Sequence, residues 1–365
     1  MKAVICYERD KPVVVEEIEH DAPGRDEVCV RMAASGVCHS DLSVVTGVMP
    51  LMLPCVLGHE GAGVVEEVGE GVTHVKPGDR VVFSWVATCG TCYFCRIGKQ
   101  NLCELGEKVN RMSMLPDGTS RLHKDGKDLF SFSGIATMAE TVIAHASSAV
   151  KVPDDAPLDK AALLGCAVMT GVGAVFNTAK VPPGSSVAVF GAGGVGLNVI
   201  QGAAIAGAEK IIAVDVQPKK LALAKTFGAT HTIDSSKDDA VTAIKEITDG
   251  RGSDFAFEAI GIPEVIEQAY AACRKGGTCV VVGVGPFGAS VNLNAFLIPL
   301  LEKSIVGSWY GGANPHRDIP NLLALYRAGK LLLDELVTRT YKIGEINEAF
   351  SDMQSGVNAR GVIVF

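Results

Sequence analysis

The stretch SVAVF-GAGGVG, residues 186–196, carries the strongest structural signal in this 365-residue chain. Its apolar first half is typical of a buried strand, and its glycines match the pattern G-x-G-x-x-G directly before an apolar helix. In that pattern Gly191 allows a tight turn, Gly193 lets the backbone approach a pyrophosphate, and Gly196 lets the helix pack closely on the strand. The stretch therefore predicts a dinucleotide site at a helix N-terminus. A glycine turn that serves packing alone is the alternative.

A carboxylate follows at the position that such a site needs. Asp215 ends the next apolar strand, nineteen residues after Gly196. There it can accept hydrogen bonds from the adenosine ribose and repel a 2′-phosphate. Lys219 and Lys220 lie close by and could accommodate that phosphate. The acid favours NAD over NADP.

Apolar strands alternate with Ala-rich helices around this stretch. Further strands are expected at 211–215, 255–258 and 279–284. The alternation predicts an α/β fold with a parallel, doubly wound sheet. The uncharged segment 187–208 is long enough to span a bilayer, but six glycines and two amides favour a strand, a turn and a buried helix.

The first 150 residues have a different pattern. Short apolar runs at 13–18, 28–32, 63–68 and 80–85 are bounded by Gly, Pro or Asp, which is typical of antiparallel strands. A strand-like run at 361–365 indicates that the tail rejoins this region. The chain is long enough for two cores, so we expect two domains.

The composition favours small-molecule chemistry. A formal net charge of -8 and a pI near 5.5 argue against nucleic-acid or membrane partners, because both need clustered Lys and Arg. The N-terminus becomes charged before an apolar segment of signal-peptide length develops. Eleven cysteines, four of them crowded together, suit reduced thiolates better than disulfides. We therefore expect a cytoplasmic protein.

The crowded cysteines have the spacing of a metal site. They are Cys89, Cys92, Cys95 and Cys103. Four thiols in fifteen residues suit one tetrahedral zinc ion with no open position, which is a structural site. The last interval and the lack of a following proline fit an iron–sulfur cluster poorly. A disulfide pair is the other alternative.

Three further candidates are scattered along the chain. Cys38, His59 and Cys166 could ligate a second metal ion, but their spacing alone is a weak signal. Taken singly, each is more often an ordinary core or surface residue.

Together these motifs resemble one family. The segments GVCHSD at 36–41 and GHE at 58–60, the four cysteines, Cys166 and the glycine stretch occur in the order and at the intervals of the medium-chain, zinc-containing alcohol dehydrogenases. The likeness covers essentially the whole chain.

The resemblance implies a two-domain organisation. Residues 1–167 and 310–365 would form a GroES-like β catalytic domain with both zinc sites, and residues 168–309 a Rossmann domain that binds NAD. The segment 104–133 is similar to that of the longer, often dimeric branch of the family, so we expect a homodimer.

The resemblance also implies the catalytic residues. Cys38, His59 and Cys166 would hold a catalytic zinc that keeps a fourth position open. Asp41 would fix the tautomer of His59, and Glu60 would approach the metal during ligand exchange. A solvated surface acid is the alternative for both carboxylates.

The implied reaction is hydride transfer between an alcohol carbon and nicotinamide, with zinc polarising the oxygen as a Lewis acid. Ser40 resembles the hydroxyl that takes the proton. Ser43 stands where several relatives have a histidine, so the last relay step departs from the family pattern. His39 would bind the cofactor, pass the proton outward, or both.

The predicted cofactor-binding set comes from the glycine motif and from the resemblance. It comprises Gly191, Gly193, Gly194, Val195, Gly196, Asp215, Lys220, Arg360, His39 and Thr170. For the two lone cations, Lys220 and Arg360, an exposed solubilising charge is the alternative.

Three apolar residues fall where relatives line the substrate channel. If Met49, Trp85 and Phe132 do so here and are not ordinary core, the slot suits primary aromatic or longer-chain alcohols. A thiol-dependent formaldehyde dehydrogenase of the same family is the nearest alternative, and a zinc-free quinone reductase would not need these cysteines. The alternative of another class is a non-enzymatic NAD- and zinc-binding structural or regulatory protein.

Overall fold

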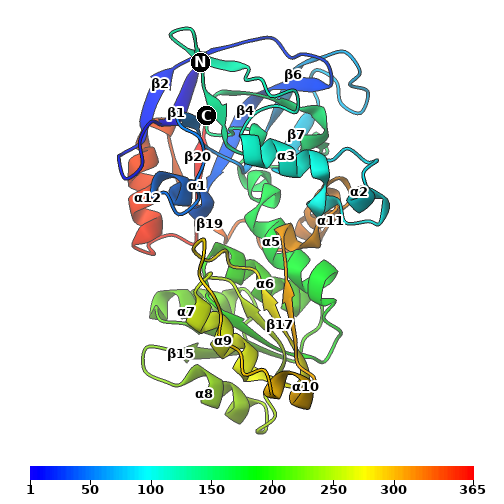
Figure 1. Cartoon of the computed structure of the whole chain (residues 1–365), viewed down its shortest axis with the longest axis vertical. Helices are drawn as coiled ribbons and strands as arrows, with labels where there is room; N and C mark the ends of the chain where they lie inside the picture. The colour runs from blue at the N-terminus through cyan, green and yellow to red at the C-terminus, as the bar shows by residue number, and fades with distance from the viewer. The chain divides into compact units, whose positions relative to one another are not determined.

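The computed structural model describes residues 1–365 and divides into two compact units. Unit 1 comprises Met1–Cys166, Asn314–Gly329 and Leu333–Phe365, and unit 2 comprises Ala167–Ala313 and Lys330–Leu332. Both chain termini lie in unit 1 (Figure 1).

Unit 2 is built on a six-stranded sheet in the order β15-β14-β13-β16-β17-β18, and every strand pair is parallel. The strands are β13 Ser186–Phe190, β14 Lys210–Asp215, β15 His231–Asp234, β16 Ser253–Glu258, β17 Cys273–Val281 and β18 Ser304–Gly307. The helices are α5 Ala167–Gly173, the π-helix η5 Ala174–Ala179, α6 Gly194–Ile205, α7 Pro218–Thr226, α8 Ala240–Ile247, α9 Pro263–Ala272, α10 Leu297–Leu301 and η6 Tyr310–Gly312. The predicted doubly wound sheet is confirmed.

The expected strands of unit 2 begin within two residues of the apolar runs, except for β17. β13 has the expected bounds, but β17 begins six residues earlier than expected, at Cys273, because charged residues and two glycines interrupt its apolar pattern. The short strands β15 and β18 were not expected. β15 contains only one fully buried residue, and β18 is a largely exposed edge strand, so neither has the apolar run of a central strand.

Unit 1 is mainly β, as its short alternating runs predicted. Its strands are β1 Lys2–Cys6, β2 Val14–Glu17, β3 Glu19–His20, β4 Glu27–Val37, β5 Cys55–Val56, β6 Gly61–Val68, β7 Arg80–Phe83, β8 Leu122–Lys124, β9 Lys127–Asp128, β10 Phe130–Ser131, β11 Thr141–His145, β12 Ala149–Lys151, β19 Val337–Tyr341 and β20 Arg360–Val364. Its helical segments are α1 His39–Val45, α2 Tyr93–Arg96, η1 Gln100–Leu102, α3 Glu104–Met112, η2 Phe132–Gly134, η3 Ala146–Ser148, α4 Leu158–Ala161, η4 Ala162–Gly165, α11 Pro315–Arg327, η7 Ile343–Glu345 and α12 Ile346–Gln354.

Strand β4 organises unit 1. It pairs antiparallel with β6, β11 and β20 in a seven-stranded sheet, while β1, β2, β5 and β10 form a four-stranded sheet. Because β20 comes from the C-terminal end, the prediction that the tail rejoins the first region is confirmed; Figure 1 shows the red strand beside the blue one. Val37, Val44 and Leu57 belong to one buried core cluster, so the residues beside them are held rigidly.

The apolar segment 187–208 forms β13, the glycine turn and α6, as predicted. No single helix of the chain combines the length and the hydropathy needed to cross a membrane, and the pair Leu158–Gly165 with Ala167–Ala179 meets that criterion only when its two parts are taken together.

Candidate active site

Three side chains from distant parts of unit 1 meet in its interior. Cys38 lies between β4 and α1, His59 lies between β5 and β6, and Cys166 follows η4. Their sulfur and nitrogen atoms, together with a carboxylate oxygen of Glu60, all lie within 4.8 Å of one another, and all four residues are buried. The predicted zinc ligands therefore form a cluster that could hold a metal ion.

Asp41 fixes the orientation of His59. It is fully buried in the first turn of α1, and its Oδ1 lies 3.2 Å from His59 Nδ1. The same carboxylate accepts hydrogen bonds from the backbone N–H groups of Gly58 and Cys38, at 3.0 and 3.2 Å. With Nδ1 held by a carboxylate, the other ring nitrogen of His59 is the one that can bind a metal.

The donor chemistry of this cluster fits zinc. His59 Nε2 is buried and has no hydrogen-bond partner, which is costly unless a bound ion satisfies the nitrogen. Two thiols and one imidazole are a ligand set found in catalytic zinc sites. Burial lowers the pKa of His59, but the charges of Asp41 and Cys38 outweigh it and hold the pKa well above its ordinary value. A binding metal ion would therefore displace a proton from the ring.

The two thiols of the cluster are electrostatically different. A hydrogen bond from the Cys166 thiol lowers the pKa of Cys38 well below its ordinary value, against the effect of burial. The same hydrogen bond and burial raise the pKa of Cys166. One thiolate therefore forms readily before any metal binds, and metal binding must remove the second proton.

Glu60 and Arg360 form a buried ion pair beside the cluster. Burial raises the pKa of Glu60 to about 7, although Arg360 opposes the shift. Only 5% of Arg360 is exposed, so the alternative of an exposed solubilising charge is wrong for this residue. The sequence does not reveal this pair, because no spacing rule links residues 300 positions apart.

The two predicted proton-relay residues directly follow Cys38 in the chain. The Ser40 hydroxyl lies 3.8 Å from the sulfur of Cys38 and is half-buried. The neighbouring His39 is exposed. A hydroxyl beside the cluster and an imidazole nearer to solvent have the positions that outward proton transfer needs.

The predicted pocket residues differ in their surroundings. Phe132 packs edge-on against His59 with ring centroids 5.0 Å apart. Met49 is partly buried and packs against the same core cluster as Phe132. Trp85 is buried. Of these three residues, Phe132 therefore contacts the cluster formed by Cys38, His59 and Cys166.

The four crowded cysteines form a second cluster in unit 1. Their sulfur atoms also lie within 4.8 Å of one another. Cys103 Sγ lies 3.6 Å from Cys89 Sγ and 3.9 Å from Cys92 Sγ. Sulfur atoms held at 2.3 Å by a tetrahedral zinc ion would be about 3.8 Å apart. All eleven cysteines are free, so the disulfide alternative is wrong, and the arrangement fits a closed four-thiolate zinc site.

The glycine stretch of unit 2 has the geometry that its pattern predicted. Gly191 has φ +95°, and a Cβ on Gly196 would lie 1.7 Å from the carbonyl oxygen of Gly191. No atom lies within 4 Å of a Cβ built on Gly193, so the backbone there is open to a ligand. Helix α6 begins with Gly194 and Val195, so its N-terminus lies at the turn.

Asp215 lies beside this turn at the end of β14. Its carboxylate accepts hydrogen bonds from the N–H groups of Ala192 and Gln217, each at 2.9 Å. Lys220 lies in α7 and Thr170 in α5, both half-buried and both in unit 2. The structure therefore joins the carboxylate to the glycine turn.

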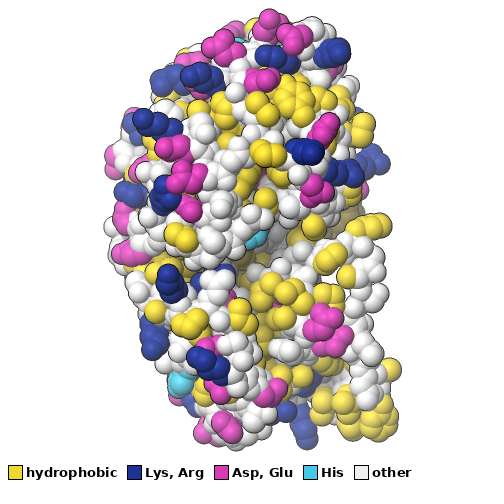
Figure 2. Space-filling view, turned by 90° about the vertical axis from the view of Figure 1, so that its left-hand side faces the viewer, with side chains coloured by type: hydrophobic (Ala, Val, Ile, Leu, Met, Phe, Trp, Pro, Cys, Tyr) yellow, Lys and Arg dark blue, Asp and Glu magenta, His cyan; other side chains and the backbone are white.

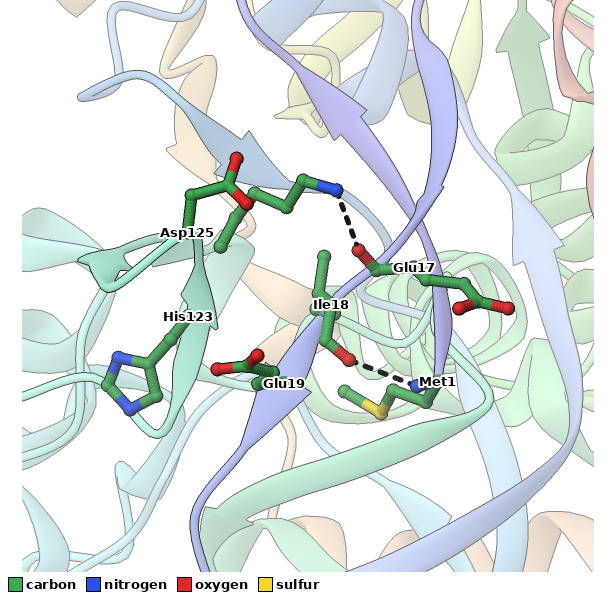
Figure 3. Close-up of a pocket in the computed structure, with 7 residues that line it drawn as sticks. Met1, Glu17, Ile18, Glu19, His123 and Asp125 are labelled. Atoms are coloured by element: carbon green, nitrogen blue, oxygen red, sulfur yellow. Dashed lines mark hydrogen bonds between the residues drawn. The ribbon is translucent and has the colours of Figure 1, made fainter.

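A separate pocket of about 290 Å³ lies in unit 1 near the N-terminus (Figure 3). Backbone and side-chain atoms from Met1, Glu17–Glu19 and His123–Asp125 line it. None of the predicted site residues does so. This pocket is not a candidate for the active site.

Two family models match the chain. The model described as the alcohol dehydrogenase GroES-like domain matches residues 24–154, and the one described as zinc-binding dehydrogenase matches residues 194–328. Both matches agree with the fold that the motifs implied.

Similar proteins cover the chain from end to end. An NDMA-dependent alcohol dehydrogenase of Amycolatopsis methanolica is 42% identical, with 100% of this chain and 98% of the relative aligned. The crystal structure of an alcohol dehydrogenase zinc-binding domain protein from Burkholderia ambifaria has a TM-score of 0.96 at 39% identity, covering 100% of this chain and 98% of that one. Benzyl alcohol dehydrogenase from Acinetobacter calcoaceticus has a TM-score of 0.95 at 36% identity, covering 100% and 99%.

These matches decide which class of protein this chain belongs to. A regulatory protein without activity and a zinc-free reductase are set aside, because the matched models and relatives are zinc-binding and alcohol dehydrogenases. The chain belongs to the medium-chain, zinc-containing alcohol dehydrogenases.

Proposed function

We propose that this enzyme interconverts primary alcohols and aldehydes with NAD and binds two zinc ions. Cys38, His59 and Cys166 would hold the catalytic ion, and the four-cysteine cluster the structural one. The observation that carries this proposal is the buried, partnerless Nε2 of His59 among two thiols, with Nδ1 held by Asp41. Three protein ligands leave a tetrahedral ion one position for substrate.

Each side chain around the cluster has a proposed task. Zinc would supply Lewis acidity and nicotinamide would carry the hydride. Ser40 accepts the substrate proton at Oγ and releases its own hydroxyl proton outward, where His39 takes it up nearer to solvent. Asp41 keeps His59 in the tautomer that binds metal. Glu60, paired with Arg360, places a carboxylate close enough to exchange with a ligand of the ion.

NAD is the proposed cofactor, bound by the predicted glycine-stretch residues with Asp215, Lys220, Thr170, His39 and Arg360. The carboxylate beside the glycine turn supports NAD, because a 2′-phosphate there would meet a negative charge. We assign the glycine-stretch part of the NAD site to residues 168–309. Catalysis, with the cofactor contacts of His39 and Arg360, is assigned to residues 1–167 and 310–365. We place the enzyme in the cytoplasm, where thiols stay reduced.

Aromatic or longer-chain primary alcohols are the proposed substrates. Phe132 packs against His59, and Met49 and Trp85 add apolar surface in the same unit. The likeness to a benzyl alcohol dehydrogenase supports the same class. An apolar slot gains free energy from each buried CH₂ group of a substrate, about 0.8 kcal/mol.

The test is a panel of alcohols and aldehydes assayed with NAD and NADP, with zinc content measured on the same sample. We expect higher kcat/KM for benzyl alcohol than for ethanol, and higher kcat/KM with NAD than with NADP. Turnover of formaldehyde only when a low-molecular-weight thiol is present would instead establish the thiol-dependent alternative. Equal or better efficiency on ethanol would contradict the proposed substrate class.

A homodimer is the proposed assembly. The edge strand β18 is mostly exposed, and α10 contains no buried residue. Phe296 and Leu300, at the start of α10 and within it, are 73% and 60% exposed, and apolar side chains gather at the lower end of unit 2 in Figure 2. Monomers rarely expose such patches, and an uncharged edge strand can pair with its own copy about a two-fold axis.

Sedimentation of the wild type and of Leu300→Glu tests the assembly. We expect a dimer for the wild type and dissociation for the variant, because a carboxylate at an apolar interface is desolvated without a partner. Val357→Glu, at an equally exposed apolar position of unit 1, is the control and should stay dimeric. A monomeric wild type would refute the proposal.

A further inference from the structure

The strand order of unit 2 reverses between β13 and β16. From β13 the chain proceeds outward through β14 and β15, and from β16 it proceeds the other way through β17 and β18. In open α/β sheets, ligands bind beyond the carboxyl ends of the two strands at such a reversal. The glycine turn after β13 lines one side of this ligand position. The residues that follow β16 line the opposite side.

Glu258 is the last residue of β16 and lies opposite Phe190, the last residue of β13. It is fully buried. Its Oε1 accepts hydrogen bonds from the N–H groups of Ile260 and Gly261 at 2.8 and 2.7 Å. Its Oε2 is buried without a partner. Burial raises the pKa of this carboxyl against the lowering effect of the backbone hydrogen bonds.

The turn that this carboxylate holds packs closely on two neighbouring segments. Gly261 has φ +90°, and a Cβ there would lie 2.4 Å from the carbonyl oxygen of Val284, in the segment after β17. On the other side, a Cβ on Gly191 would lie 2.6 Å from the side chain of Ile260. One buried carboxylate thus fixes a turn that contacts both the glycine stretch and the next strand end.

We infer that Glu258 is a positioning residue for the dinucleotide: it never contacts the cofactor, but holds the 259–261 turn as the second wall of its site. The inference rests on the proposed binding of NAD. A carboxylate buried with one unpartnered oxygen costs free energy, so its contribution to folding alone does not explain it. Holding two adjacent N–H groups in one turn is a task that an apolar side chain of equal size cannot perform.

The structure offers a matched control on the same strand. Asp254 lies near the opposite, amino end of β16 and also accepts a backbone hydrogen bond, from Ser186 N–H at 2.7 Å, together with an ion pair to Arg274. Because this end of a parallel sheet faces away from the ligand position, loss of the Asp254 carboxylate should affect folding stability without affecting the cofactor.

The experiment measures the Kd of NADH by fluorescence and the hydrogen exchange of the Ile260 and Gly261 amides in the cofactor-free enzyme, with Tm as the index of stability. Glu258→Leu should raise the Kd at least about tenfold and speed exchange at both amides, because two hydrogen bonds to a charged acceptor are lost. Glu258→Asp, which keeps the charge but shortens the reach, should raise the Kd less. Glu258→Gln keeps an acceptor oxygen and should restore affinity to within about threefold.

The outcomes separate the inference from the function on which it rests. A wild-type enzyme that binds neither NADH nor NADPH would refute the proposed function. A wild type that binds NADH while Glu258→Leu and Glu258→Asp bind it equally well would overturn the positioning role alone. If Asp254→Asn weakens NADH binding as much as Glu258→Leu does, the effect is general loss of stability, which also overturns the inference. A lower Tm with unchanged Kd for Asp254→Asn supports it.

Discussion

The two cysteine-containing clusters of unit 1 use similar donors in opposite surroundings. The four-cysteine cluster comes from one run of fifteen residues, and two of its members, Cys89 and Cys92, are only partly buried. Its sulfurs accept backbone hydrogen bonds, such as Cys92 N–H to Cys89 at 3.3 Å. The Cys38 cluster comes from three distant segments, is fully buried, and is surrounded by charged side chains.

From this difference we expect the four-cysteine cluster to stabilise the fold and the Cys38 cluster to perform the chemistry. Four thiolates fill the coordination sphere of a tetrahedral ion and leave no position for a substrate. In the other cluster the donors are unequal, one imidazole is oriented by Asp41, and Glu60 and Arg360 place opposite charges beside it. Perturbed, buried charges of this kind cost stability and are found mainly where function needs them.

Loss of His59 should have the largest effect. His59→Ala removes one of three ligands from the Cys38 cluster and none from the other. We expect kcat/KM to fall by at least about 10³-fold and zinc content to fall by one ion per chain, with the structural ion retained. Retention of both ions and of activity would show that the cluster is not the catalytic site.

Loss of Cys103 should reduce the stability of the fold, because it removes a ligand from the four-cysteine cluster and none from the Cys38 cluster. A structural zinc ion contributes directly to folding free energy. Cys103→Ser should therefore lower the free energy of unfolding by at least about 3 kcal/mol, measured by chemical denaturation together with zinc content. A variant as stable as the wild type would mean that the four-cysteine cluster does not contribute to the stability of the fold.

Ser40→Ala tests the chemistry of the first cluster without touching a ligand. A positioned proton acceptor contributes about 10²-fold or more to rate. We expect kcat to fall by that factor while both zinc ions remain, measured by steady-state kinetics and metal analysis. Unchanged turnover would remove Ser40 from the relay.

The smallest expected effect is on folding stability, and it comes from a group of polar side chains around His123 in unit 1. His123 lies 2.9 Å from Asp21 and 3.0 Å from Asp128 beside the pocket of Figure 3. The hydrogen bond to Asp21, opposed by burial and supported by Asp128, raises the pKa of His123. Both acids are more than half exposed, so solvent screens these pairs.

The sign of the pH effect follows from that raised pKa. The stability that charged His123 contributes is fully present below the unfolded-state pKa of about 6.5 and is lost as pH rises through the higher folded-state pKa. His123→Gln should therefore destabilise by no more than about 1 kcal/mol near pH 5.5, and by nothing measurable at high pH. Urea denaturation at several pH values checks this, and a difference that grows with pH would contradict it.

The sequence predicted what depends on local pattern. Strand β13 and the glycine turn follow from eleven consecutive residues, and the four-cysteine cluster from fifteen. The edge strand β18 was missed because an exposed strand lacks a continuous apolar run. The Cys38 cluster was predicted only through family resemblance, since its members come together through tertiary structure.

The residues that tune the site were the hardest to predict. Arg360 pairs with Glu60 across 300 positions, a contact that only the return of β20 to β4 creates. Glu258 appeared in the sequence only as the end of a strand. Its role depends on a burial and a turn geometry that neither composition nor periodicity records.

Zinc anomalous scattering from crystals of the enzyme would locate the metal ions directly. We expect two peaks per chain, one among the four cysteines and one bonded to Cys38 Sγ, His59 Nε2 and Cys166 Sγ with its fourth position free for substrate. A peak at the four-cysteine cluster alone, or an ion near Cys38 that His59 does not bind, would contradict it.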